Sequence, residues 1–190
     1  GPFANRVDVA TGADGNLWVL NNGYQGHSTL TVVGPDRSIK ATYTIPTPNA
    51  SASALALGPD GNIWFVESQA NKVGKVTPSG VFTEYDVPPV LVDLHMGTGP
   101  VAVAANPTDI IAGPDGAMWF TESSSGGIGR VTTDGLVGAI PTPGLQPTSL
   151  AAGTDGLIWF TDTTGAGSIT RLNGDGTVTS FALPTPRSWP

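Results

Sequence analysis

Apolar residues in this chain fall in short runs that are separated by glycine, proline, aspartate and asparagine, and the same order of runs occurs four times. Each copy contains a Gly-x-Asp-Gly-x-x-Trp segment, and these segments begin at Gly12, Gly58, Gly113 and Gly153. The starting points lie 46, 55 and 40 residues apart. A period in this range is typical of a repeat that holds four short strands. The pattern therefore predicts an all-β repeat protein.

The fourth copy shows the expected strands most clearly. Strands A to D are predicted at 148–152, 157–161, 168–172 and 177–183. The Asp-Gly pairs between strands favour tight hairpin turns of type I′, in which both central residues have positive φ. The same four-strand frame fits residues 8–45, 53–87 and 108–140. Each copy is therefore expected to form one antiparallel sheet.

A single four-stranded sheet cannot cover both of its faces, so the copies are expected to stack as the blades of a β-propeller. We predict one propeller domain over residues 1–190, with blades at about 6–46, 51–88, 106–142 and 146–184. A closed ring of four blades is the first interpretation. The alternatives are part of a larger seven- or eight-bladed ring and two half-rings that pair.

Two residue types recur at fixed places in every copy and have a structural interpretation. The strand-B tryptophans are typical of a core between blades, because a residue repeated in every copy serves the geometry that all copies share. Aspartates in the Asp-Gly pairs are typical turn formers. The tryptophans are Trp18, Trp64, Trp119 and Trp159.

Composition narrows the possible partners. Only 12% of residues are charged, the net charge is −7, and there is no run of Lys or Arg, so neither nucleic acid nor a membrane surface is an expected partner. No apolar stretch is long enough to cross a bilayer. The chain has no cysteine, and its composition slightly favours a secreted or periplasmic location. The leading Gly1-Pro2 resembles a remnant of protease cleavage, which leaves open an engineered or excised repeat array.

Connectivity separates two ends of the predicted ring. The A–B and C–D turns fall at one end, and the longer B–C and D–A loops fall at the other, where binding residues tend to gather. An insertion at about 86–106 is the longest of these loops. Its apolar residues Val90, Leu91, Leu94 and Met96 predict that it packs over the ring opening. The candidate residues of this loop rim are Asn21, His27, Glu67, Asp93, His95, Glu122 and Asp162.

Two interpretations of the rim stay open. Its carboxylates and imidazoles could bind Mg²⁺ or Ca²⁺ or act as acid and base groups, with Glu67 and Glu122 as candidate metal ligands. Alternatively, Glu67 and Glu122 pair with Lys72, Lys75 or Arg130, and the histidines lie on the surface. Lys75, Arg130 and Arg171 occupy equivalent places in strand C, which favours the second interpretation.

The full repeat resembles that of the streptogramin B lyase (virginiamycin B lyase) family. The third copy reads Gly-Pro-Asp-Gly-Ala-Met-Trp-Phe-Thr-Glu up to Glu122, followed by Ile128-Gly129-Arg130-Val131. The second copy repeats this pattern up to Glu67, and Phe82-Thr83-Glu84-Tyr85 follows. The resemblance covers most of the chain. It implies a seven-bladed propeller and a magnesium-assisted elimination that linearises cyclic depsipeptides.

The resemblance also locates the family's catalytic groups, a histidine just before strand A and the glutamate that ends strand B. The positions that match the histidine are Val7, Ser53, Thr108 and Thr148. An elimination needs a general base, and none of these side chains is an imidazole. We therefore predict a lyase-like propeller that is a non-catalytic binding or scaffold module at its loop rim. The ligand would be a small molecule or peptide, and the chain a monomer or homodimer. An active lyase using Glu67, Glu122, His27 and His95 is the alternative.

Overall fold

The repeat folds into four antiparallel sheets, as the sequence predicts. The computed structural model describes residues 7–22, 27–92, 101–164 and 167–184. In each sheet the four strands follow one another in chain order, and every neighbouring pair is antiparallel. The all-β fold of four-stranded blades is therefore confirmed. Within the described residues there is no helix of a length and apolarity that could cross a membrane.

The strands of the first two blades are β1 (Val7–Thr11), β2 (Leu17–Asn22), β3 (Ser28–Val33), β4 (Ile39–Thr44), β5 (Ala52–Leu57), β6 (Ile63–Glu67), β7 (Lys72–Val76) and β8 (Phe82–Asp86). The strands of the last two blades are β11 (Pro107–Ala112), β12 (Met118–Glu122), β13 (Gly127–Val131), β14 (Val137–Pro141), β15 (Pro147–Ala152), β16 (Ile158–Asp162), β17 (Ser168–Leu172) and β18 (Val178–Ala182).

Alternating side chains give each blade two apolar faces. We call the face that meets the preceding blade the rear face and the one that meets the following blade the forward face. In the first seam, Trp18 and Leu30 of blade 1 pack with Ile63 and Phe65 of blade 2. Two further core clusters join blade 2 to blade 3 and blade 3 to blade 4. The core therefore lies between blades.

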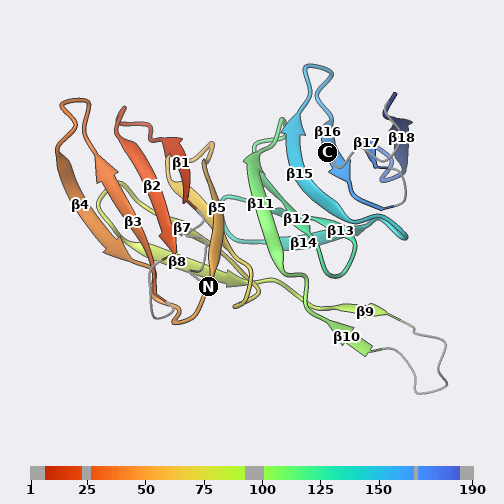
Figure 1. Ribbon diagram of the computed structural model, residues 1–190, viewed down its shortest axis with the longest axis horizontal. Coiled ribbons are helices and arrows are strands. Elements are labelled where there is room, and N and C mark those ends of the chain that lie inside the picture. The colour runs from red at the N-terminus through yellow and green to blue at the C-terminus, as the bar shows by residue number, and fades with distance from the viewer. Residues whose placement is uncertain (1–6, 23–26, 93–100, 165–166, 185–190) are drawn as a thin grey trace.

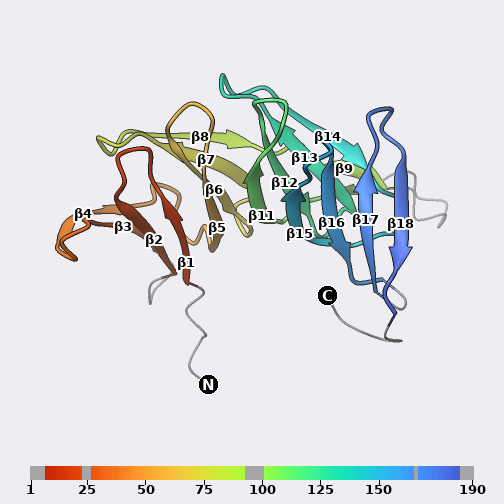
Figure 2. The same ribbon diagram turned by 90° about the horizontal axis from the view of Figure 1, so that it is seen from above.

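The blades form an open arc rather than a closed ring. The first strands of the blades lie side by side in the series β1, β5, β11 and β15. Blade 1 and blade 4 lie at opposite ends of the arc in both views (Figures 1 and 2). The closed four-blade ring is therefore wrong, and the alternative of a part of a larger ring describes the arrangement.

The Asp-Gly turns differ in type from the prediction. In the first turn the N–H of Gly15 donates to the carbonyl of Gly12 at 3.0 Å, and Gly12 N–H donates to Asn16 O at 2.8 Å. Gly15 has φ of 77°, whereas Asp14 is not among the residues with positive φ. This is the geometry of a longer hairpin turn that ends in a left-handed glycine. The type I′ prediction is wrong because the aspartate instead accepts the N–H of Asn16 at 3.0 Å.

The insertion between blades 2 and 3 contains a hairpin, which the sequence did not predict. Strands β9 (Val90–Val92) and β10 (Val101–Val103) pair antiparallel and project away from the blades (Figure 1). Leu91 is 69% exposed. The prediction that the described part of this insertion packs over the ring opening is therefore wrong. Asp93, Leu94, His95 and Met96 lie outside the described residues.

Two glycines in the third blade test how tightly a seam is filled. A Cβ at Gly129 would lie 2.0 Å from the ring of Phe120, whereas a Cβ at Gly138 would meet nothing within 4 Å. We expect Gly129→Ala to lower the free energy of unfolding by about 1–3 kcal/mol through overpacking. The matched Gly138→Ala should stay within about 0.5 kcal/mol of the parent. Urea unfolding measures both, and equal midpoints would contradict this packing.

Candidate functional site

The candidate carboxylates end strand B at the same level of each blade. Glu67 pairs with Ala52, Glu122 with Pro107 and Asp162 with Pro147, each at the start of strand A. In blade 1 the equivalent residue is Asn21, which is exposed. The repeat thus brings one polar residue per blade to one end of the arc.

Glu67 is fully buried at the seam between blades 1 and 2, and neither of its carboxyl oxygens accepts a hydrogen bond. Its neighbour is a second carboxyl group, that of Glu84. Burial is the largest cause that raises the pKa of Glu67 to about 8, and the charge of Glu84 and a hydrogen bond with it add to the effect. Lys72 and Thr47 act in the opposite direction. At neutral pH Glu67 is therefore mainly protonated.

Glu84 receives the donors that Glu67 lacks. Thr47 donates to it from both its backbone N–H, at 3.3 Å, and its hydroxyl, at 2.8 Å, and Lys72 Nζ lies 3.5 Å from Glu84 Oε2. Because Thr47 belongs to the connection after blade 1, this carboxylate ties blade 2 to blade 1. Sequence reasoning missed this role. The available signal was alternation, which places Glu84 on the same apolar face as Phe82.

Glu122 occupies the equivalent place in blade 3 with a different environment. It is also fully buried, and Ser125 Oγ donates to its Oε2 at 2.9 Å, while Oε1 has no partner. Burial raises the pKa of Glu122, and the bond from Ser125 opposes this shift. The shared position thus gives two buried glutamates that are costly to ionise.

Asp162, one methylene shorter, is a fully bonded version of the same position. It accepts from Gln146 N at 2.8 Å, from Thr164 N at 3.0 Å and from the Thr164 hydroxyl at 2.6 Å, and Ser168 Oγ lies 3.4 Å away. The aspartate therefore holds the ends of the surrounding loops together. Both of its carboxylate oxygens accept hydrogen bonds, whereas neither oxygen of Glu67 does.

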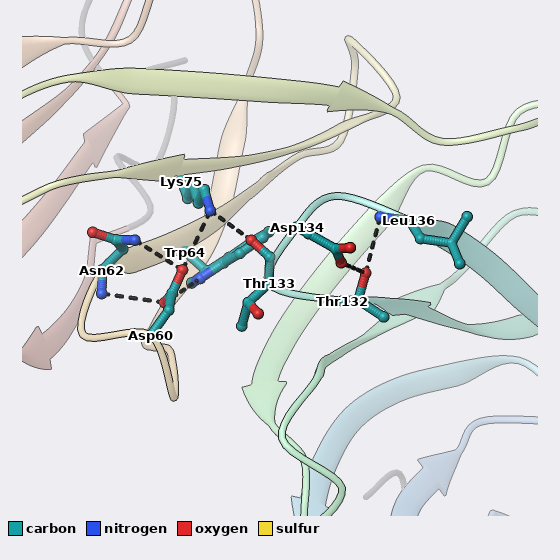
Figure 3. A network of polar contacts seen from close by, with 8 residues as sticks. All are labelled: Asp60, Asn62, Trp64, Lys75, Thr132, Thr133, Asp134 and Leu136. Carbon is teal, nitrogen blue, oxygen red and sulfur yellow. Dashed lines mark hydrogen bonds and ion pairs between the residues drawn. The ribbon is translucent and has the colours of Figure 1, made fainter.

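The strand-C cations point to the other end of the blades. Lys75 Nζ lies 3.3 Å from Asp60 Oδ2, and Arg130 Nε lies 2.6 Å from Asp115 Oδ2. Figure 3 shows that Lys75 also donates to the carbonyl of Thr133 in the next blade, at 2.6 Å. The interpretation that Glu67 and Glu122 pair with Lys75 or Arg130 is therefore wrong. Lys72 instead pairs with Glu84 and, at 3.7 Å, with Asp86.

Three of the four positions that match the family histidine lie in β-bulges, whereas Val7 pairs in regular register with Asn21. The register shifts between Ala52 and Ala54, between Pro107 and Ile110 and between Pro147 and Ser149, which leaves Ser53, Thr108 and Thr148 in the irregular segments. Bulges of this kind re-aim side chains and are frequent beside active sites.

The hydroxyls at these bulges are engaged in hydrogen bonds. The Oγ1 atoms of Thr108 and Thr121 are 2.9 Å apart, and those of Thr148 and Thr161 are 2.8 Å apart. Ser53 donates to the carbonyl of Thr108 in the next blade at 3.1 Å. In these blades the hydroxyl at the bulge therefore links strand A to strand B of its own blade, or, at Ser53, links one blade to the next.

Of the remaining rim candidates, only His27 belongs to the part of the chain that the structure describes. His27 is exposed, and Asp93 and His95 lie outside the described residues. Across the described ranges no three His, Cys, Asp or Glu side chains come close enough to hold a metal ion. A groove of about 310 Å³ lies at the opposite, turn end between blades 3 and 4, where Asp115, Trp119 and Leu172 contribute to its lining.

The seams, the open arc and the strand-B acidic residues define a partial β-propeller with a polar loop rim. The model of the virginiamycin B lyase family matches residues 4–96 and again 96–190. The chain therefore belongs to that family.

Individual relatives are longer than this chain. Virginiamycin B lyase from Nocardia farcinica is 36% identical over 80 residues, which is 42% of this chain and 27% of that protein. A structure of catalytically inactive virginiamycin B lyase from Staphylococcus aureus with quinupristin is 29% identical, with a TM-score of 0.82, and the match covers 100% of this chain and 60% of that one. A selenomethionine structure of the Staphylococcus aureus enzyme matches with a TM-score of 0.78 at 29% identity, over 95% of this chain and 56% of that one. The chain thus spans less than two thirds of these relatives.

The raised pKa of Glu67 predicts a pH-dependent stability. Between about pH 4.5 and 8 the native state holds a proton that the unfolded chain releases, so the unfolding free energy falls as pH rises through this window. The slope for one such group approaches about 1.4 kcal/mol per pH unit. We expect Glu67→Gln to reduce this slope, because the amide imitates the protonated acid, and Glu67→Gln with Glu122→Gln to reduce it further.

Urea unfolding over this pH range measures the slope. Asp86→Asn, at an exposed carboxylate in the same blade, is the matched control and should keep the parent slope. Equal slopes for Glu67→Gln and the parent would show that Glu67 is ionised throughout the range.

Proposed function

We propose that these four blades act as a non-catalytic binding module whose ligand surface is the rim of the B–C and D–A loops. The observation that carries the proposal is the hydrogen bonding of the side chains at the three bulge positions. Ser53, Thr108 and Thr148 stand where the family has its histidine, and their hydroxyls are occupied by hydrogen bonds within and between blades. Proton abstraction requires a base with a free lone pair and a suitable pKa, which an engaged hydroxyl does not offer.

The buried glutamates support the same proposal. Their carboxyl groups are enclosed in the seams, and burial favours their neutral form. A substrate at the rim would have no direct access to them while the seams are closed. Binding groups would then come from exposed parts of the rim, such as Asn21 and His27, and from the insertion that carries the β9–β10 hairpin.

Quinupristin, the compound in the Staphylococcus aureus structure, is the probe of choice. We expect calorimetry to detect its binding and chromatography to detect no linear product, with or without Mg²⁺. Retention time and fragmentation have to be used, because an elimination within one ring conserves mass. Asn21→Lys should weaken binding about tenfold, because it places a long cation on the rim.

Ala13→Lys is the matched control for that variant, because it adds the same side chain to the exposed turn at the other end of blade 1. Equal losses in both variants, or no binding by the parent chain, would contradict a ligand surface at the rim.

A lyase is the second candidate, and one observation favours it. Glu67 has a pKa of about 8, which is suitable for proton transfer near neutral pH. The same chromatographic assay distinguishes the two functions. Magnesium-dependent appearance of linear quinupristin that is lost in His95→Ala and in Glu67→Gln would overturn the non-catalytic proposal and support a lyase.

A further inference from the structure

One aromatic contact is present in blades 1 and 2 and is replaced in blade 3. Tyr43, Tyr85 and Ile140 occupy the same position of strand D, on the forward face of their blades. Each tyrosine ring stacks on the strand-B tryptophan of its own blade, with 5.9 Å between the ring centroids in both blades. Trp119 of blade 3 has Ile140 in place of the stacked ring. The third seam therefore holds a smaller side chain than the first two at this point.

The C–D turn of the following blade shows the consequence. Gly80 and Gly135 end these turns in blades 2 and 3, where a Cβ would lie 2.2 Å from the ring of Tyr43 and 2.1 Å from the ring of Tyr85. Gly176 ends the same turn in blade 4, and a Cβ there would meet no described atom within 4 Å. Gly176 is exposed, whereas the other two glycines are half-buried. A tyrosine ring thus covers the turn in the first two seams, and the turn of the third seam is left bare.

The groove of about 310 Å³ between blades 3 and 4 lies at this point. Its lining includes the tryptophan, the isoleucine that replaces the tyrosine and the bare turn glycine, which are Trp119, Ile140 and Gly176. Trp119 is 9% exposed, whereas Trp18 is 1% and Trp64 is 0% exposed. The volume is close to the lower limit for small-molecule sites, which is about 300 Å³.

We propose that this groove binds a flat aromatic group of a small molecule, of the size of a phenol ring, stacked on Trp119. The fold accepts a ring of this kind at the same place in two other seams, where the chain supplies it from strand D. In the third seam a ligand ring would cover both Trp119 and Gly176. Stacked aromatic pairs gain more free energy than burial of their area alone provides, so a ring is favoured over an aliphatic group of equal size.

The charges at the groove favour an uncharged ring. Burial acts to raise the pKa of Asp115, but hydrogen bonds from Trp119 and Arg130 outweigh it and keep this pKa below its ordinary value. Arg130 is thereby paired within its own blade, with 2.6 Å between its Nε and Asp115 Oδ2. The described lining of the groove contains no lysine or arginine. An anionic ligand would therefore find no free cation here.

The groove lies at the turn end of the blades, opposite the loop rim. It is enclosed by two neighbouring blades inside the arc, so its shape does not depend on the first or the last face of the arc. This inference stands apart from the proposed function of the rim.

Titration with p-cresol, the analogue of a tyrosine side chain, tests the site by heteronuclear NMR of the isotope-labelled chain. The signals of the Trp119 indole N–H and the Gly176 amide should shift on addition of p-cresol. Gly135, which Tyr85 already covers, should keep its position. Methylcyclohexanol, the saturated analogue with the same non-hydrogen skeleton, should bind at least about tenfold more weakly, because its ring is not flat.

Three variants test the argument from equivalent seams. Ile140→Tyr supplies the missing ring from strand D, so it should abolish the shifts caused by p-cresol and raise the urea midpoint. Ile39→Tyr makes the same change at a position that is 70% exposed in blade 1, and it should keep the parent affinity. Tyr85→Ile should open an equivalent groove in the second seam, so that p-cresol also shifts the signals of Trp64 and Gly135.

Several outcomes would overturn the proposal. These are a parent chain whose Trp119 and Gly176 signals do not respond to p-cresol, equal affinity for the saturated analogue, an Ile140→Tyr variant that keeps the shifts, and a Tyr85→Ile variant without a second set. Circular dichroism checks that each variant is folded. If Ile140→Tyr loses the fold, the two titrations of the parent chain still decide the proposal.

Discussion

The structure depends on one constraint: a four-stranded sheet with apolar residues on both faces is stable only when neighbouring sheets cover it. In the first two seams a large strand-B side chain, Phe65 or Phe120, lies over a strand-C glycine of its own blade, Gly74 or Gly129, whereas in the third seam Phe160 pairs with Thr170. The absence of a side chain beneath the ring lets the preceding blade approach. Burial of these faces supplies the main driving force, because the molecule has few charges and no cysteine.

The same constraint explains why equivalent residues have different roles. Positions deep in a seam have to be apolar in every blade, whereas positions at the ends of strands can vary. At the end of strand B the repeat tolerates Asp162 with several donors, Glu122 with one, and Glu67 with none. A buried carboxyl group without donors is costly when ionised and much less costly when protonated. Glu67 therefore marks a position at which packing alone does not explain the residue.

Much of the fold could be predicted from the sequence, because the recurring Gly-x-Asp-Gly-x-x-Trp segment fixes both the number of blades and the strand order. Whether the blades close into a ring could not be predicted, because this depends on the angle between blades. That angle is set by the volumes of the side chains packed in each seam. The Asp14-Gly15 turn was assigned to the wrong type because its composition fits two hairpin geometries. At the site, sequence placed Glu67 and Glu122 at equivalent strand ends, but burial, the partner Glu84 and the engaged bulge hydroxyls depend on contacts between segments far apart in the chain.

An open arc also bears on where a ligand could bind. In a closed propeller, loops from all blades surround one opening, so a ligand can contact several blades at once. In the arc, the four strand-B ends are presented along a curve, and their three carboxyl groups are buried instead of facing a shared space. In the proposed binding function, affinity would come from exposed loops and from the β9–β10 hairpin, which projects away from the blades. Packing between blade faces therefore determines both the curvature of the arc and which polar groups of the rim are accessible.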